Sequence, residues 1–210
     1  MISDAFSNAF RSERLIYRAV ENDEADRVFL HTQLANDPAI IALSEPMLLR
    51  PRSIKHSEWM AEQLAKSILA VMICLPHERS CGEGADKGED EPPKPIGFMV
   101  LGWGGSSSNV AHHRSVDLGI ALAAQYQGKG YGTETINWAL DWTFRFGNYH
   151  RVTLCTVSYN KSAQHLYNKL GFVEEGRSRE SHWFDRKWHD TISYGMLDRE
   201  WEALRGLEKE

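Results

Sequence analysis

The sequence has few cysteines, no long apolar run and no excess of basic residues. Its cysteines, Cys74, Cys81 and Cys155, are odd in number and lack metal-site spacing, which predicts a reducing compartment and no metal site. The longest apolar stretch, 68–75, has the length of a strand and is too short to span a membrane. The first residues also lack the apolar core of a secretory signal peptide. We therefore expect a cytoplasmic protein without a membrane segment.

The charge balance argues against a nucleic-acid-binding protein. There are 24 basic and 29 acidic residues, a net charge of −5 at pH 7, whereas nucleic-acid affinity comes from neutralising phosphates. The same balance is compatible with an amine-bearing partner. With 210 residues, 42% of them hydrophobic and 25% charged, the composition is that of one globular domain. We expect a single domain over 1–210 with a core of about 12–201.

Apolar periodicity predicts strands and helices along the chain. Strands are expected at 12–20, 67–75, 96–103, 115–122, 150–157, 172–175 and 191–196, and helices at 21–34, 53–66, 131–146 and 160–170. The segment 176–190 is expected to be a long connection between the last two strands. Residues 76–95 are rich in glycine, proline and acidic side chains without periodicity, so we expect a mobile insertion in a hairpin there.

A glycine-rich turn joins the strand at 115–122 to the longest predicted helix. It reads QGKGYG from Gln127 to Gly132. Glycines leave backbone N–H groups uncovered and a helix start carries partial positive charge, so this turn is predicted to bind an anion. No Lys-Ser or Lys-Thr pair follows, as a P-loop requires, and the GxGxG spacing differs from the GxGxxG of dinucleotide-binding folds.

Two motifs together carry a family resemblance. Gln127-x-x-Gly130-x-Gly132 after one strand, and NKSAQHLYNKLGF from Asn160 to Phe172 after the next, resemble the GNAT superfamily of acetyl-CoA-dependent N-acetyltransferases. The ending HDTISYGML and the opening SERLIYRAVENDEADRVF are similar to its Rim-type branch, which includes acetylases of ribosomal-protein N-termini and has spermidine acetyltransferases as relatives.

The resemblance implies both a fold and an activity. The fold is α/β (α+β): a mixed, mostly antiparallel sheet of six or seven strands flanked by about four helices, with parallel strands around 118–122 and 152–157 that splay apart to hold the cofactor. The activity is acetyl transfer from acetyl-CoA to a primary amine by direct attack in a ternary complex, without a covalent enzyme intermediate.

The resemblance also assigns the residues that hold acetyl-CoA. In this family the strand before the turn carries the pantetheine arm, the turn amides carry the pyrophosphate, and an asparagine after the next strand contacts the arm. The matching residues are Ile120, Ala121, Leu122, Gln127, Gly128, Lys129, Gly130, Tyr131, Gly132, Thr133 and Asn160.

Two catalytic roles follow from the same resemblance. Tyr167 matches the tyrosine that protonates the departing thiolate, and Asp117 matches a strand acid that faces the acceptor amine in part of the Rim-type branch. An aliphatic amine with a pKa of about 10 must lose a proton before it attacks, which costs about 4 kcal/mol at pH 7. In some relatives the base is a glutamate at the position of Cys155, so an ordered water, His182 or Glu180 stay open as bases.

The sequence leaves the acceptor amine open. A peptide N-terminus, a polyamine, an amino sugar and a small xenobiotic amine all fit, and a homodimer is compatible but not required. Trp59, Trp183, Phe184 and Trp188 are candidates for lining the acceptor cleft. Two other functions stay open: a non-catalytic acyl-CoA-binding module, and a nucleotide- or phosphate-binding protein that uses the same glycine turn.

Overall fold

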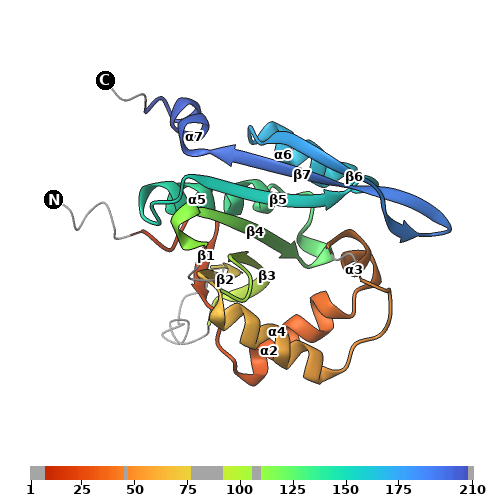
Figure 1. Cartoon of the computed structure of the whole chain (residues 1–210). Helices are drawn as coiled ribbons and strands as arrows, with labels where there is room; N and C mark the ends of the chain where they lie inside the picture. Colours follow the sequence, from red (N-terminus) through yellow and green to blue (C-terminus); the bar gives the residue numbers. More distant parts are fainter. Residues whose placement is uncertain (1–7, 45–46, 77–91, 106–109, 208–210) are drawn as a thin grey trace, which may run out of the picture.

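The chain folds around one seven-stranded sheet (Figure 1). A computed structural model describes residues 8–44, 47–76, 92–105 and 110–207. The strands are β1 (Ile16–Ala19), β2 (Leu69–Leu75), β3 (Lys94–Leu101), β4 (Ser115–Leu122), β5 (Arg151–Val157), β6 (Val173–Phe184) and β7 (Lys187–Leu197). Their order is β1-β2-β3-β4-β5-β7-β6, and every neighbouring pair is antiparallel except β4 with β5. The predicted mixed, mostly antiparallel sheet is confirmed.

Six α-helices lie within the described residues, two more than the four predicted. They are α2 (Glu24–Phe29), α3 (Pro38–Ser44), α4 (Ile54–Lys66), α5 (Tyr131–Arg145), α6 (Lys161–Lys169) and α7 (Asp198–Leu204), and a π-helical segment, η1 (Leu30–Ala35), continues α2. The two additional helices are α3 and α7. In the part of the chain that the structure describes, no helix is long and apolar enough to cross a bilayer.

Helix α3 begins where the sequence places an aspartate before a proline. The Asp37 Oδ1 atom accepts hydrogen bonds from the backbone N–H groups of Ala39 (2.9 Å) and Ile40 (3.2 Å). This satisfies donors that a helix start leaves without partners, and proline is favoured in the first helical position. The short helix places Ile40 and Ser44 beside the sheet, where both residues line the two cavities described below.

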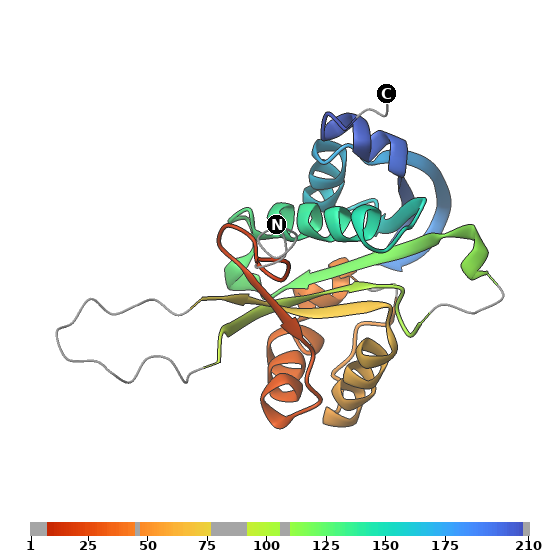
Figure 2. The ribbon, with the colours of Figure 1, turned by 90° about the vertical axis from the view of Figure 1, so that its left-hand side faces the viewer.

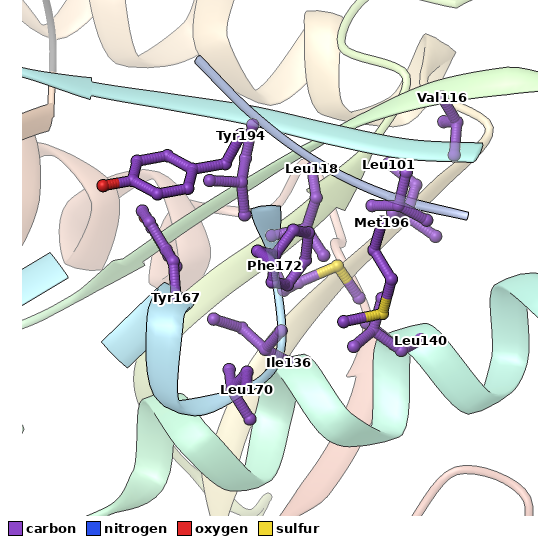
Figure 3. Close-up of a cluster of buried hydrophobic side chains, with 14 of the residues drawn as sticks. Leu101, Val116, Leu118, Ile136, Leu140, Tyr167, Leu170, Phe172, Tyr194 and Met196 are labelled. Carbon is purple, nitrogen blue, oxygen red and sulfur yellow. The ribbon is translucent and has the colours of Figure 1, made fainter. Parts of the chain in front are cut away.

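Helices cover both faces of the sheet and bury two apolar cores (Figure 2). Helices α2 and α4 with η1 cover one face, and α5, α6 and α7 cover the other. The best-patterned helix, α5, buries Ile136, Ala139, Leu140 and Thr143, which confirms its predicted apolar stripe. Figure 3 shows Ile136 and Leu140 pointing from this helix toward side chains of the sheet.

The parallel pair β4–β5 opens partway along its length. Ladder pairing joins Ser115 to Arg151, Val116 to Val152 and Asp117 to Thr153, and it stops there although both strands continue. Figure 1 shows the two strands separating toward their ends, near α3. The splayed parallel strands expected from the resemblance are therefore confirmed, and unpaired backbone in the gap becomes available to a ligand.

The predicted connection at 176–190 is wrong, because most of it is strand. Strands β6 and β7 form a long hairpin that extends beyond the rest of the molecule (Figure 1), turning at Asp185 and Arg186 with φ values of 45° and 61°. The side chains of β6 are almost all exposed because it is an edge strand. It therefore lacks the alternation of apolar and polar residues that marks a strand in sequence.

The expected insertion joins two paired strands. Leu75 at the end of β2 pairs with Lys94 at the start of β3, so the segment between them does connect the arms of a hairpin. Residues 77–91 lie outside the described residues, and the mobility expected for them stays a prediction.

Candidate active site

The glycine turn presents a row of free backbone donors. Gly128 and Gly130 have φ values of 71° and 84°, a left-handed conformation that glycine adopts without strain. Gly130 precedes α5, and the first hydrogen bond of the helix runs from Glu134 N to Gly130 O at 3.1 Å. The N–H groups from Gly128 to Thr133 have no acceptor in the described part of the chain. This arrangement fits the predicted binding of a pyrophosphate.

An arginine from the N-terminal segment supports the turn, and the sequence did not reveal it. Arg14 Nη1 donates a hydrogen bond to the carbonyl of Lys129 at 3.0 Å. The Arg14 guanidinium also lies 4.8 Å from the centroid of the Tyr131 ring. A positive charge is thus fixed next to the free amides, where it favours an anionic ligand. No motif marks this contact, because Arg14 is distant in sequence.

A cavity of about 330 Å³ runs from the glycine turn into the gap between β4 and β5. Its wall is formed by the ends of both strands, the turn, α3 and α6: Ile40, Leu43, Ser44, Leu118, Gly119, Ile120, Ala121, Leu122, Gln127, Gly132, Cys155, Thr156, Val157, Asn160, Ser162, Ala163, Leu166, Tyr167 and Thr191. The predicted arm-binding residues 120–122 and Asn160 line it, as do Gln127 and Gly132. Gly128, Lys129, Gly130, Tyr131 and Thr133 belong to the turn or the helix start and do not line this cavity.

Tyr167 closes the inner end of this cavity. Its ring is 9% exposed and packs edge-on against Tyr194, with the ring centroids 5.7 Å apart. Burial, with smaller contributions from the nearby Cys155 and Tyr194, raises the pKa of the Tyr167 phenol to about 12. The hydroxyl has no hydrogen-bond partner in the described part of the chain. Tyr167 therefore stays protonated at neutral pH and has a free proton to donate.

Asn160 has a structural role of its own. Its Oδ1 accepts a hydrogen bond from Ala163 N at 3.1 Å and caps α6, and its Nδ2 donates to the Leu43 carbonyl at 3.3 Å. The side chain thus ties α3 to α6 across the cavity that it lines.

Asp117 lies at the last paired position before the strands separate. Its side chain is exposed and lines neither this cavity nor the second one described below. The backbone N–H of Trp103 lies 3.5 Å from Asp117 Oδ2. Partial burial raises the pKa of the Cys155 thiol, and the negative charge of Asp117 raises it as well. The Asp117 carboxylate therefore interacts electrostatically with a residue that lines the cavity.

The other candidate bases also line neither cavity. His182 is buried, with its Nε2 3.1 Å from the Tyr159 hydroxyl. Glu180 is exposed, and its backbone N–H donates to Asp190 Oδ1 at 3.0 Å. Like Asp117, neither side chain lines a cavity, but of the three only Asp117 acts electrostatically on a cavity residue, Cys155.

A second cavity of about 230 Å³ opens on the opposite side of β4. It is lined by Leu34, Ala35, Ile40, Ser44, Met47, His56, Trp59, Met60, Phe98, Val100, Trp103, Gly119, Ile120 and Ala121. The two cavities share Ile40, Ser44 and residues 119–121. They therefore meet at the centre of β4, as a site for two substrates requires.

Of the four aromatic residues expected near the acceptor, only Trp59 lines one of these two cavities. Trp183 and Trp188 are exposed on the β6–β7 hairpin and pack against each other, with their ring centroids 5.1 Å apart. Phe184 stacks on Tyr159 at 5.0 Å. None of these three lines either cavity.

The sequence and the fold agree on the family. The chain belongs to the acetyltransferase (GNAT) family, whose sequence profile matches residues 50–172. It is 40% identical over 79 residues to the spermidine N(1)-acetyltransferase of Vibrio cholerae serotype O1, covering 38% of this chain and 46% of that protein. It is 27% identical over 88 residues to the [ribosomal protein uS5]-alanine N-acetyltransferase of Escherichia coli K12, covering 42% of this chain and 45% of that protein.

A solved structure extends the likeness over almost the whole chain. The spermidine N-acetyltransferase from Vibrio cholerae, in complex with CoA and spermine, superposes with a TM-score of 0.68 and 26% identity, covering 90% of this chain and 99% of that one. In sequence, the chain spans about half the length of the curated relatives it matches.

Within the described residues, no three His, Cys, Asp or Glu side chains gather where they could hold a metal ion.

Proposed function

We propose that this protein transfers the acetyl group of acetyl-CoA to a primary amine by direct attack within a ternary complex. The observation that carries the proposal is the cavity between β4 and β5, whose lining includes Gly132 of the glycine turn and Tyr167. Membership of the acetyltransferase (GNAT) family and the relatives' names support the same activity.

In this proposal the glycine turn and the splayed strands position the thioester. The amides of 128–133 and the Arg14 guanidinium receive the pyrophosphate, while residues 120–122 and Asn160 flank the pantetheine arm. Backbone N–H groups of β4 that lack a β5 partner can stabilise the oxyanion that forms on the thioester carbonyl. Holding both reactants in adjoining cavities contributes further through proximity.

The amine must lose one proton and the departing sulfur must gain one. The neutral amine nitrogen bonds to the carbonyl carbon, the carbon–sulfur bond breaks, and Tyr167 gives its proton to the thiolate. The ammonium form of the amine gives one proton to the base before attack, and the second proton, released from nitrogen once the carbon–nitrogen bond has formed, restores the phenol.

Asp117 is the base that this proposal favours. The carboxylate lies beside Trp103, which lines the second cavity, and its charge acts on Cys155, which lines the first. Because the side chain lines neither cavity, we infer that it collects the amine proton through one water molecule.

The test combines ligand binding with turnover. CoA should raise the melting temperature more than ATP or NAD at equal concentration, since a ligand at 100 times its Kd adds about 2.7 kcal/mol of stability. Acetyl-CoA with a peptide, a polyamine, an amino sugar and a small apolar amine should release thiol for at least one of them. Stabilisation by ATP or NAD alone would point to a nucleotide-binding protein, and CoA binding without turnover to a non-catalytic module.

Cytoplasmic location, a single domain and a homodimer remain predictions. Cys74 and Cys155, the cysteines within the described residues, are both free, which fits a reducing compartment.

A further inference from the structure

Helix α3 lies at the junction of the two cavities. Ile40 and Ser44, about one helical turn apart, line both cavities, and so does the middle of β4 at residues 119–121. An amine that enters through the second cavity meets a thioester held in the first cavity at this junction. A side chain at the junction is therefore placed to act on the reacting nitrogen itself, whatever the rest of the acceptor is.

Two side chains from the segment after β5 fix the end of α3. The last carbonyl groups of a helix lack partners within the helix. Here the Tyr159 hydroxyl donates a hydrogen bond to the Ala42 carbonyl, and Asn160 Nδ2 donates to the Leu43 carbonyl at 3.3 Å. Both carbonyls belong to the last turn of α3, so these bonds hold the residue that follows them, Ser44, in a defined position.

The Tyr159 side chain is itself held by the β6–β7 hairpin. Its ring stacks on Phe184 with the centroids 5.0 Å apart and lies edge-on to His189 at 4.7 Å. The His182 Nε2 atom lies 3.1 Å from the Tyr159 hydroxyl oxygen. The position of Ser44 is therefore tied to the sheet through these contacts and does not depend on α3 alone.

The Ser44 hydroxyl is oriented as a hydrogen-bond acceptor. Its Oγ donates its one proton to the Ile40 carbonyl at 2.6 Å. The oxygen lone pairs are then the part of the hydroxyl that can bind a ligand, and they accept hydrogen bonds. A hydroxyl that donates to a carbonyl is also polarised into a stronger acceptor. An N–H group of an amine is the complementary donor.

We propose that Ser44 is a further catalytic residue, whose Oγ accepts a hydrogen bond from the acceptor nitrogen as this attacks the thioester. The inference rests on the proposed acetyltransferase function. One N–H group of the neutral amine donates to Ser44, which orients the nitrogen lone pair toward the carbonyl carbon.

The contact strengthens as the reaction proceeds. Positive charge develops on the nitrogen as the carbon–nitrogen bond forms, and a charged N–H group is a stronger donor than a neutral one. An interaction that is stronger in the transition state than with the bound substrate raises kcat. Ser44 keeps its own proton on the Ile40 carbonyl throughout, so it exchanges no proton with the amine.

Removing the hydroxyl tests the contact. We expect Ser44→Ala to lower kcat/KM about tenfold, in keeping with the loss of one hydrogen bond to a group that becomes charged. The loss should agree within about twofold for hexylamine and spermidine, because the contact is with the amino group that both amines have. Ser44→Thr retains the hydroxyl and should restore kcat/KM to within about threefold of the parent value.

Thr32→Ala is the matched control. The Thr32 Oγ1 atom donates to the Val28 carbonyl at 2.8 Å, four residues earlier in the chain as in the Ser44 bond, and Thr32 lines neither cavity. This variant should keep the parent kcat/KM. An unchanged kcat/KM in Ser44→Ala, a loss equal to that of Thr32→Ala, or a loss confined to one of the two amines would overturn the proposal.

The pH profile separates this contact from a base. Because Ser44 exchanges no proton, kcat/KM of Ser44→Ala should fall by the same factor at every pH, whereas loss of a base moves the profile toward the pKa of the free amine. A profile that moves in this way in Ser44→Ala would mean that Ser44 takes part in proton transfer, and it would contradict the proposed role.

Binding to the complex with CoA separates this proposal from the proposed function, which fails only if no amine of any class is acetylated. If the parent protein acetylates neither hexylamine nor spermidine, calorimetry with hexylamine and the protein saturated with CoA decides the contact. The Kd for hexylamine should then be at least about threefold higher for Ser44→Ala than for the parent protein and for Ser44→Thr. Equal Kd values, or no binding of hexylamine to the parent protein, would overturn the contact.

Discussion

The Arg14 Nε atom donates a hydrogen bond of 2.8 Å to Glu134 Oε2, which links the segment before β1 to the first turn of α5. The backbone N–H of Arg14 and the Ser12 hydroxyl donate to Oε1 of the same carboxylate at 2.7 Å and 2.6 Å. Burial alone would raise the pKa of Glu134, but these hydrogen bonds outweigh it and hold the pKa below its usual range. The carboxylate is therefore charged and fixes Arg14 beside the glycine turn.

We expect Arg14→Ala to weaken CoA binding by about fivefold. The variant loses a partly exposed, charge-assisted contact, worth about 1 kcal/mol after allowance for screening. Calorimetric titration with CoA should show a higher Kd, while kcat at saturating acetyl-CoA stays close to the parent value. Arg179→Ala is the matched control, since Arg179 is exposed on β6 away from the turn. Equal Kd values for both variants would remove Arg14 from cofactor binding.

A carboxylate placed at Gly132 should repel the cofactor. Gly132 lines the cavity, and an added Cβ would lie 3.5 Å from Leu166 Cδ2 and 3.8 Å from Leu122 Cδ1, which are ordinary contacts. We expect Gly132→Glu to raise the Kd for CoA at least tenfold more than Gly132→Gln does, because the two side chains differ mainly in charge. Similar Kd values for the pair would mean that the pyrophosphate lies elsewhere.

Replacing Asp117 should move the pH profile. Without a nearby carboxylate only amine that is already neutral reacts, so in Asp117→Asn the rise of kcat/KM shifts toward the pKa of the free amine, about 10. Near neutral pH we expect a loss of at least tenfold. Asp185→Asn, at the tip of the hairpin, is the control. Superimposable profiles for Asp117→Asn and the parent protein would exclude Asp117 as the base.

Stability should decline at alkaline pH. Burial raises the pKa values of Tyr17 and Tyr167 to about 12 each, above the value of about 10 in the unfolded chain. The folded state thus holds these protons more tightly, and the free energy of unfolding falls as pH rises from about 10 to 12, by up to about 3 kcal/mol per tyrosine.

The Tyr17→Phe variant isolates one of these contributions. The Tyr17 ring stacks on Trp138 with centroids 3.9 Å apart, and phenylalanine preserves that contact. Urea denaturation between pH 9 and 12 should show a smaller loss of stability for the variant than for the parent protein. An identical loss would mean that the Tyr17 phenol does not titrate in this range in the folded protein.

The elements around the cofactor cavity were predictable because their signals are local. Strand β4 alternates bulky residues such as Val116 and Leu118 with small or polar ones, and its predicted bounds match the structure. The left-handed conformations at Gly128 and Gly130 need glycine, which is visible in sequence. Asn160 marks the start of α6 by its capping chemistry.

The acceptor side was not predictable in the same way. Trp59 lies on α4, Phe98 lies within β3 and Trp103 follows β3, and only the packing of α4 against the sheet brings the three to one wall. Arg14 reaches the glycine turn through a contact between distant segments. The edge strand β6 escaped detection because its exposed side chains show no burial pattern.

The most direct test of the account is kcat for Tyr167→Phe at saturating acetyl-CoA, with the Kd for CoA measured alongside. The variant keeps the buried ring and loses only the hydroxyl that points to no other partner in the described residues. We expect kcat to fall by about 10²-fold, as for loss of a general acid, while the Kd for CoA changes less than about twofold. An unchanged kcat would contradict the role of Tyr167 and the proposed reaction path through the cavity between β4 and β5.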